Sequence, residues 1–172
     1  MLKSIAVRVA QGTQYIKDPR QASPAGLRAR PVVGNDPFAV LLADDLIWNR
    51  GPGALAQMVE LAERESASVI AVQDVPRDQT ASYGIVATRE FSHRHGDISE
   101  IVEKPKPEVA PSTLAVVGRY ILSPQIFEML EATRAGAGGE IQLTDGIAAL
   151  LKQDRVLAYR VEGRRFDCGS RI

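Results

Sequence analysis

From residue 36 onward, the chain alternates between continuous apolar runs and stretches with helical periodicity. The runs FAVLLA (38–43) and SVIAVQDV (68–75) are typical of strands buried on both faces of a parallel sheet. Between them, Gly51-Pro52-Gly53 interrupts the chain. A helical face follows, made of Leu55, Met58, Val59 and Ala62. We therefore predict a strand–helix–strand unit with a right-handed crossover.

The remaining apolar runs predict more strands. SYGIVATREF (82–91) and GDISEIVEKP (96–105) flank a polar tip, which is typical of an antiparallel β-ribbon. LAVVGRYIL (114–122) is another continuous run, and RVLAYRVEG (155–163) alternates like a strand. The fold class predicted by this pattern is α/β, with a mixed central sheet flanked by helices and a β-ribbon excursion.

Two short helices are expected late in the chain. Ser123 is a candidate N-cap, with Pro124 at the first helical position. Thr144 is a candidate cap for the second helix, and Asp145 would then lie in its first turn. The apolar face of the second helix is formed by Ile147, Leu150 and Leu151.

Composition excludes several classes of protein. The 172 residues are 45% apolar and 24% charged with a formal net charge of zero, so no cationic field favours nucleic acid or a membrane surface. The sequence contains neither a membrane-length apolar run nor a secretory leader pattern. Because Cys168 is the single cysteine, no internal disulfide can form, and we expect a reducing cytoplasm.

Residues 1–30 differ from the rest. The stretch is polar, with two prolines and no clear period, so it predicts an irregular or non-native-looking segment. Residues 31–172 carry the strand and helix patterns and predict one partial domain. The abrupt end at residue 172, directly after a candidate site motif, suggests a fragment.

Acidic residues follow the first buried strand. Asp44 and Asp45 lie where ligands bind in open α/β sheets, at the carboxyl end of a strand. Carboxylates of this kind hold Mg²⁺ together with substrate phosphates. The alternative is a pair that caps a helix or solvates a loop. Asp167, in FDCG, could supply a second carboxylate, and the alternative there is a turn aspartate.

Glu103 and Lys104 end a strand pattern and are stopped by Pro105. Neighbours on a strand point to opposite faces, so both can serve one pocket only if the strand ends there. Lys104 could hold a phosphate and Glu103 could accept hydrogen bonds from hydroxyls. The alternative is an exposed surface ion pair.

Two further stretches could line a pocket for a sugar. Tyr83 and Gly84, in SYGIV, could place bare backbone against a sugar ring, and the alternative is a strand glycine at a bulge. In GGEIQLTDGI (138–147), Glu140 and its polar neighbours could line the same pocket. The alternative for that stretch is a helix N-terminus.

The order of these motifs resembles a known family. PVVGNDPFAVLLADDLI, SYGIV, ISEIVEKPKPEVAPSTLAVVGRYILSPQIF, GAGGEIQLTDGI and FDCGSRI follow one another as in the bacterial UTP–glucose-1-phosphate uridylyltransferases. The resemblance covers residues 31–172. It implies a Rossmann-like nucleotidyltransferase fold, Mg²⁺ as cofactor and usually a homo-oligomer. It also implies the conversion of UTP and glucose 1-phosphate into UDP-glucose and pyrophosphate.

Carried over motif by motif, the resemblance implies individual roles. The metal ligands would be Asp44 and Asp167, and Lys104, catalytic together with Asp44, would contact the phosphates. Glucose would be contacted by Glu103 and Gly84, with Tyr83, Gly118 and Glu140 as further lining. The place of Asp45 in the motif does not always hold an acid.

The chain departs from the family in residues 1–30, where nothing matches the glycine-rich loop that cradles the triphosphate. We therefore expect a chain truncated at both ends, with little or no transferase activity. Two alternatives stay open. One is another sugar-1-phosphate nucleotidyltransferase, such as a thymidylyltransferase, and the other is a non-catalytic remnant that binds a sugar nucleotide.

Overall fold

The computed structural model describes residues 30–42, 44–133 and 142–168. The helices are α1 (Arg30–Val33), α2 (Ala54–Glu65), the 3-10 helix η3 (Arg77–Ser82), α3 (Ile126–Ala132) and α4 (Leu143–Leu150). The strands are β1 (Phe38–Leu41), β2 (Asp45–Trp48), β3 (Ser68–Asp74), β4 (Gly84–Ser92), β5 (His95–Glu103), β6 (Leu114–Leu122), β7 (Val156–Arg160) and β8 (Arg164–Asp167). In this part of the chain, no helix has both the length and the apolar character that crossing a membrane requires.

The main sheet has six strands in the order β1-β6-β3-β7-β5-β4. β1 and β3 are both antiparallel to β6, so they run in the same direction, with β6 between them. β3 and β7 pair as parallel neighbours, which makes the sheet mixed, as predicted. The predicted strand–helix–strand unit is therefore present, but its two strands are not adjacent.

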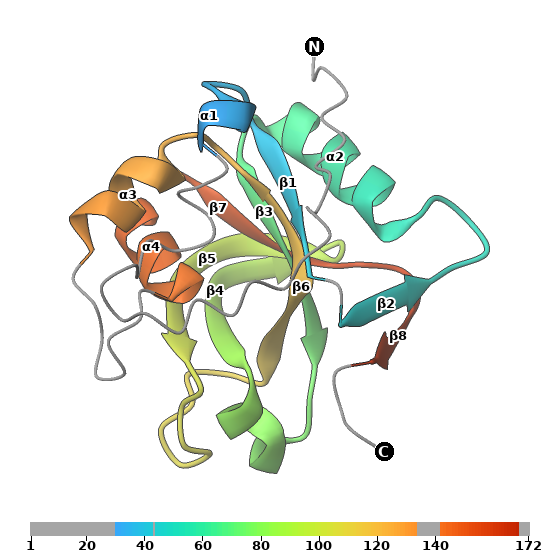
Figure 1. Cartoon of the computed structure of the whole chain (residues 1–172). Helices are drawn as coiled ribbons and strands as arrows, with labels where there is room; N and C mark the ends of the chain where they lie inside the picture. Colours follow the sequence, from blue (N-terminus) through green and yellow to red (C-terminus); the bar gives the residue numbers. More distant parts are fainter. Residues whose placement is uncertain (1–29, 43, 134–141, 169–172) are drawn as a thin grey trace.

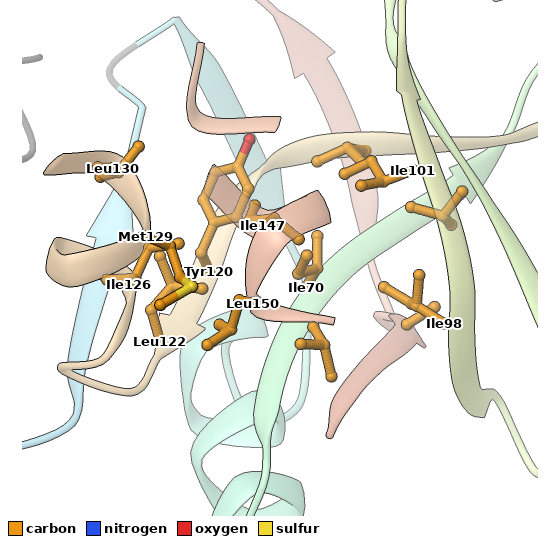
Figure 2. Packing of buried hydrophobic residues seen from close by; sticks show 14 of the residues in the cluster. Ile70, Ile98, Ile101, Tyr120, Leu122, Ile126, Met129, Leu130, Ile147 and Leu150 are labelled. Carbon is orange, nitrogen blue, oxygen red and sulfur yellow. The ribbon is translucent and has the colours of Figure 1, made fainter. Parts of the chain in front are cut away.

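Helices cover the two faces of this sheet. Figure 1 shows α2 on one side and α3 with α4 on the other. The alternation of side chains along β3 explains the layers, because Ile70 and Val72 pack into the cluster that contains α3 and α4, whereas Val69 and Ala71 pack with α2. The larger cluster is drawn in Figure 2. A continuous apolar run in the sequence thus became a strand buried on both faces.

The predicted β-ribbon is formed by β4 and β5. Its tip turns at His93 and Arg94, whose φ angles are 47° and 78°. Two consecutive positive φ values give a hairpin turn that matches the right-handed twist of the strands. The ribbon is an integral part of the sheet, because β5 also pairs with β7 and β4 with β6.

A second, two-stranded sheet stands beside the first. β2 pairs with β8 in antiparallel register, which joins residues about 120 positions apart in the sequence. One of its faces is exposed and carries Leu46, Trp48 and Phe166. An isolated two-stranded sheet is marginal in water, so this one depends on its anchors to the larger sheet.

The two predicted helix caps are wrong. The Ser123 hydroxyl lies 3.3 Å from a carboxylate oxygen of Asp154, and Gln125 occupies the N-cap position of α3. Gln142 is the N-cap of α4, so Thr144 lies inside its first turn. A threonine just inside a helix has its hydroxyl available for other contacts.

Candidate active site

Glu103 and Lys104 meet the condition that the sequence set for a shared pocket. β5 ends at Glu103, and Lys104 adopts a left-handed backbone with φ of 45°. Its N–H donates to the carbonyl oxygen of Tyr83 at 3.0 Å. The turn brings the Lys104 ammonium to 3.6 Å from Glu103 Oε1. A non-glycine residue in this conformation costs on the order of 1 kcal/mol, and such strain clusters at functional sites.

Gly84 lies directly opposite Glu103 in the register of β4 and β5. A Cβ at Gly84 would stand 3.4 Å from Glu103 Oε2 and 3.1 Å from the methyl group of Thr144. Glycine therefore fits at this position, where a side chain would be crowded by the carboxylate and the threonine methyl. The Thr144 hydroxyl is buried nearby and has no hydrogen-bond partner within the described residues. Together these groups form the first half of the site.

The second half of the site lies where β2 and β8 begin and end. Asp45 is the register partner of Asp167, and the Cys168 N–H donates to the Asp44 carbonyl oxygen at 2.7 Å. The pairing thus brings Asp44 and Asp167, the two predicted metal ligands, to the same end of the small sheet. Asp167 lies in a strand rather than in a turn.

Asp45 has a structural role at the junction of the two sheets. Its side chain is 7% exposed. One carboxylate oxygen accepts the Gly118 N–H at 2.8 Å, and the other accepts the Arg165 guanidinium. Because both oxygens already accept hydrogen bonds, we do not assign Asp45 as a metal ligand.

The polar backbone atoms of Gly118 are also engaged. Its N–H donates to Asp45, and its carbonyl oxygen accepts from Leu42 N–H at 2.9 Å and from Arg119 at 2.7 Å. A Cβ at Gly118 would lie 2.7 Å from Leu42 Cβ and 2.8 Å from Asp45 Oδ2. Glycine is needed here so that the two sheets can approach closely.

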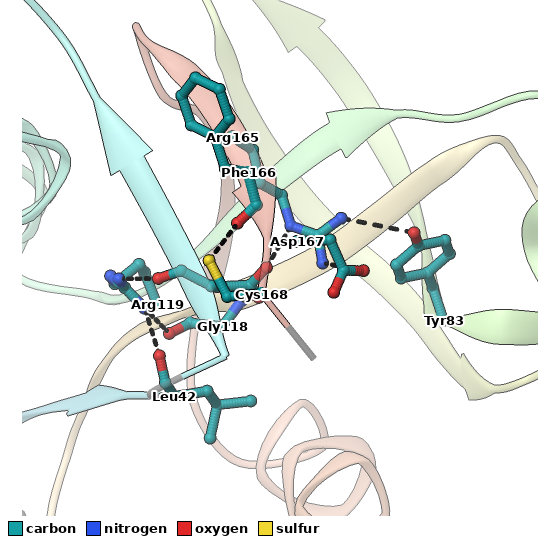
Figure 3. Close-up of polar contacts among 9 residues, drawn as sticks. Leu42, Tyr83, Gly118, Arg119, Arg165, Phe166, Asp167 and Cys168 are labelled. Atoms are coloured by element: carbon teal, nitrogen blue, oxygen red, sulfur yellow. Dashed lines mark hydrogen bonds and ion pairs between the residues drawn. The ribbon is translucent and has the colours of Figure 1, made fainter. Parts of the chain in front are cut away.

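Arg165 joins the two halves of the site. Figure 3 shows its guanidinium reaching Tyr83, the residue before Gly84. The Arg165 Nη1 to Tyr83 hydroxyl distance is 3.4 Å, and the guanidinium carbon lies 5.3 Å from the centre of the tyrosine ring. Burial alone would lower the pKa of Arg165, but hydrogen bonds to Tyr83 and Asp45 hold that pKa above its ordinary value. The guanidinium therefore stays charged.

The pKa of Tyr120 is affected by carboxylates in both halves of the site. This tyrosine sits on β6 among the side chains drawn in Figure 2. Its pKa is raised, first by burial and then by the negative charges of Glu103, Asp45 and Asp44. Negative charges in both halves thus disfavour ionisation of the same buried phenol.

The donor set fits Mg²⁺. The described residues hold no cluster of three or more His, Cys, Asp or Glu side chains that could bind a metal without help. Mg²⁺ does not need such a cluster, because one or two carboxylates and the oxygens of substrate phosphates suffice. Asp44 and Asp167 are both exposed acids at one edge, and they match this requirement.

The structure describes most of the residues that the sequence predicts for the site, and it adds connecting residues that the sequence does not predict. Glu140 lies outside the described residues. Arg165 was not singled out, although its place two residues before Asp167 puts the two side chains on one face of a strand. Tyr120 was read only as part of a buried strand, since nothing in the sequence told which tyrosine lies beneath acids.

A mixed sheet with helices on both faces and acids at strand ends is typical of α/β proteins whose ligands bind beyond the carboxyl ends of the strands. A profile described as nucleotidyl transferase matches residues 3–170. The chain therefore belongs to the nucleotidyl transferase family. The match includes most of residues 1–30, so the domain boundary after residue 30 stays a prediction.

The chain is similar to uridylyltransferases in particular. It is 48% identical over 145 residues to UTP–glucose-1-phosphate uridylyltransferase of Pseudomonas aeruginosa, covering 84% of this chain and 52% of that protein. Identity to the Komagataeibacter xylinus enzyme of the same name is 42%, covering 97% of this chain and 60% of that protein. A crystal structure of UDP-glucose pyrophosphorylase complexed with UDP-glucose superimposes with a TM-score of 0.81 at 42% identity, covering 84% of this chain and 55% of that one. The chain thus spans about half the length of these relatives.

Proposed function

We propose that this protein is a UTP–glucose-1-phosphate uridylyltransferase and that the described residues form the sugar-phosphate and metal side of its site. The observation that carries the proposal is the unbroken set of contacts from Lys104 and Tyr83 through Arg165 to Asp45 and Asp167. These contacts bring a cation and a hydroxyl acceptor close to two exposed acids. A sugar phosphate and a metal need such a combination.

On the sugar side, each group has a defined role. The Lys104 ammonium neutralises phosphate charge as a compact point charge. Glu103 accepts hydrogen bonds from glucose hydroxyls, and the lack of a side chain at Gly84 keeps that carboxylate uncrowded.

On the metal side, Asp44 and Asp167 would hold Mg²⁺. When bound, the ion neutralises developing charge on the phosphate oxygens. Asp45 and Gly118 keep the two acids at the junction of the sheets without binding the ion themselves. This difference in role explains why Asp44 is exposed whereas the adjacent Asp45 is buried.

The reaction needs positioning rather than a covalent enzyme intermediate. A phosphate oxygen of glucose 1-phosphate forms a bond to the α-phosphorus of UTP, and the bond from that phosphorus to the bridging oxygen of pyrophosphate breaks. Lys104 supplies charge neutralisation together with the cation that Asp44 and Asp167 would hold, and the held geometry supplies the rate gain from proximity. No group of the chain changes its covalent state.

The proposal is tested by titrating the chain with UDP-glucose and Mg²⁺ in a calorimeter. We expect Lys104→Ala and Glu103→Gln each to weaken binding about tenfold or more, since each removes a charged partner. The matched control is Lys106→Ala, an exposed lysine two positions away, which should bind normally. Wild-type affinity in both variants would contradict the proposal. Tighter binding of dTDP-glucose than of UDP-glucose would favour the thymidylyltransferase alternative.

A second measurement separates binding from turnover. Pyrophosphate release from UTP and glucose 1-phosphate reports the whole reaction, and its appearance would support the proposed transferase. Tight binding of UDP-glucose without turnover would favour the binding-module alternative. We also propose a cytoplasmic protein that forms homo-oligomers, which sedimentation of the purified chain with UDP-glucose would test.

A further inference from the structure

The guanidinium of Arg165 contacts three residues of the candidate site that come from different parts of the fold. Its Nε donates to Asp45, its Nη1 lies 3.4 Å from the Tyr83 hydroxyl, and its Nη2 lies 3.4 Å from Asp167 Oδ2. The side chain is only 15% exposed. These three partners come from β2, from the residue before β4, and from β8 itself. One guanidinium therefore touches both halves of the site.

The planar fork of arginine is what makes this arrangement possible. A guanidinium directs five N–H donors along fixed directions, so three acceptors around it are held at fixed angles to one another. Its face also lies against the Tyr83 ring, 5.3 Å from the ring centre. A lysine would carry the same charge but could not fix three partners at once.

The buried contact with Asp45 fixes the position of the Arg165 guanidinium, which then contacts Tyr83 and Asp167. Asp45 is anchored to Gly118 on β6, so Arg165 is tied to the main sheet through a buried carboxylate. From that fixed point the guanidinium reaches Asp167, whose side chain is 48% exposed. We propose that Arg165 is a positioning residue that couples occupation of the sugar side, through Tyr83, to the placement of the metal ligand Asp167.

The inference rests on the proposed function and deepens it. If the coupling exists, a change at Tyr83, which belongs to the sugar side, alters metal affinity, and the effect requires Arg165. A merely structural arginine would lower stability without linking the two sides. The readout is therefore metal binding, measured apart from turnover.

The experiment measures free Mn²⁺ by electron paramagnetic resonance in the presence of saturating UDP-glucose. We expect Arg165→Lys to weaken Mn²⁺ binding about tenfold, as is usual when a group that orients a metal ligand is changed. The matched control is Arg164→Lys on the same strand, because Arg164 lies over the exposed Phe166 ring. This control should bind Mn²⁺ like the wild type.

A second variant keeps the proposal testable if Arg165→Lys does not fold. Tyr83→Phe keeps the ring and removes only the acceptor of the Arg165 Nη1 hydrogen bond, and we expect it to weaken Mn²⁺ binding about threefold. Where both variants fold, the double variant should lose no more than Arg165→Lys alone. Wild-type Mn²⁺ affinity in Tyr83→Phe, or additive losses in the double variant, would overturn the coupling. A wild-type chain that binds neither UDP-glucose nor Mn²⁺ would instead overturn the proposed function and the coupling with it.

Discussion

The two halves of the candidate site are held by different forces. Glu103, Lys104 and Gly84 sit at the ends of strands in the six-stranded sheet, directly above a continuous apolar core. Asp44 and Asp167 sit on the two-stranded sheet, one face of which is exposed. The sugar side is therefore held by burial of apolar surface, and the metal side by a few hydrogen bonds.

This difference separates two ways of damaging the protein. Removing apolar volume should destabilise the whole sheet, because the core is shared by all of its strands. Removing a polar anchor should release β2 and β8 while the main sheet stays folded, because local units open at their own free energies. Variants of the two kinds should therefore unfold in different ways.

The largest effect is expected in the core. Ile147 on α4 is fully buried, so Ile147→Ala should lower the free energy of unfolding by about 2–5 kcal/mol. Urea unfolding followed by far-UV circular dichroism measures the loss. The control is Val109→Ala, at a side chain that is 72% exposed, where we expect about 0.5 kcal/mol or less. Equal losses at the two positions would contradict the prediction.

Asp45→Asn should release the small sheet. The change leaves the Arg165 guanidinium without its carboxylate, and we expect a local loss of about 2 kcal/mol, since breaking a buried ion pair is costly. Trp48, the single tryptophan, lies on β2, so its fluorescence reports this sheet alone. We expect the fluorescence transition to occur at lower urea than the dichroism transition. In the exposed control Asp36→Asn, the fluorescence and dichroism transitions should occur at the same urea concentrations as in the wild type.

Gly84→Ala should affect binding more than stability. The new methyl group would crowd the Thr144 methyl and the Glu103 carboxylate, at 3.1 and 3.4 Å. Alanine also suits a strand better than glycine, so the unfolding free energy should change by less than about 1 kcal/mol. We expect UDP-glucose binding to weaken about tenfold, or about 1.4 kcal/mol, in calorimetry. A loss of stability without a loss of affinity would place the sugar elsewhere.

The smallest effect is expected at the surface, far from both halves of the site. A hydrogen bond from Arg155 lowers the pKa of Asp97 in the folded state. A lowered folded pKa stabilises the protein above the unfolded pKa, and this contribution is lost as pH falls through the folded value. Arg155→Met should therefore cost at most about 0.5 kcal/mol at neutral pH, because both side chains are nearly half exposed.

Thermal unfolding of Arg155→Met and the wild type at several pH values checks the sign. The difference between them should shrink as the solution is acidified below the ordinary pKa of aspartate. Arg50→Met, at an exposed loop position, serves as the control. A difference that grows on acidification would mean that Asp97 is not the group responsible.

The fold class and most of the main sheet were predictable from the sequence. Continuous apolar runs located β3 and β6, and the helical period located α2, because these signals arise from burial within each element. The order of motifs also indicated a protein family, and this resemblance implied site roles for Glu103, Lys104 and Asp167. What joins them required the structure, because pairing of β2 with β8 is a contact between distant segments that neither segment encodes alone.

The errors have physical causes. Thr144 looked like a cap because threonine often precedes a helix, but the backbone entered α4 earlier, at Gln142. Residue type alone does not distinguish Asp44 from Asp45, although the family resemblance assigns only Asp44 to the metal. Their difference arises from Gly118 and Arg165, which engage Asp45 from other strands. Local patterns therefore identify candidates, and long-range packing assigns their roles.

The strand order also has a consequence for how the chain is made. β7, which ends at Arg160, lies between β3 and β5, so a central place in the six-stranded sheet is filled by the last of its own strands to be synthesised. During synthesis the earlier strands emerge first, and β3 and β5 must wait with unpaired edges for their common neighbour. Pairings between such distant segments slow folding. The six-stranded sheet should therefore be completed only after residues 156–160 have left the ribosome.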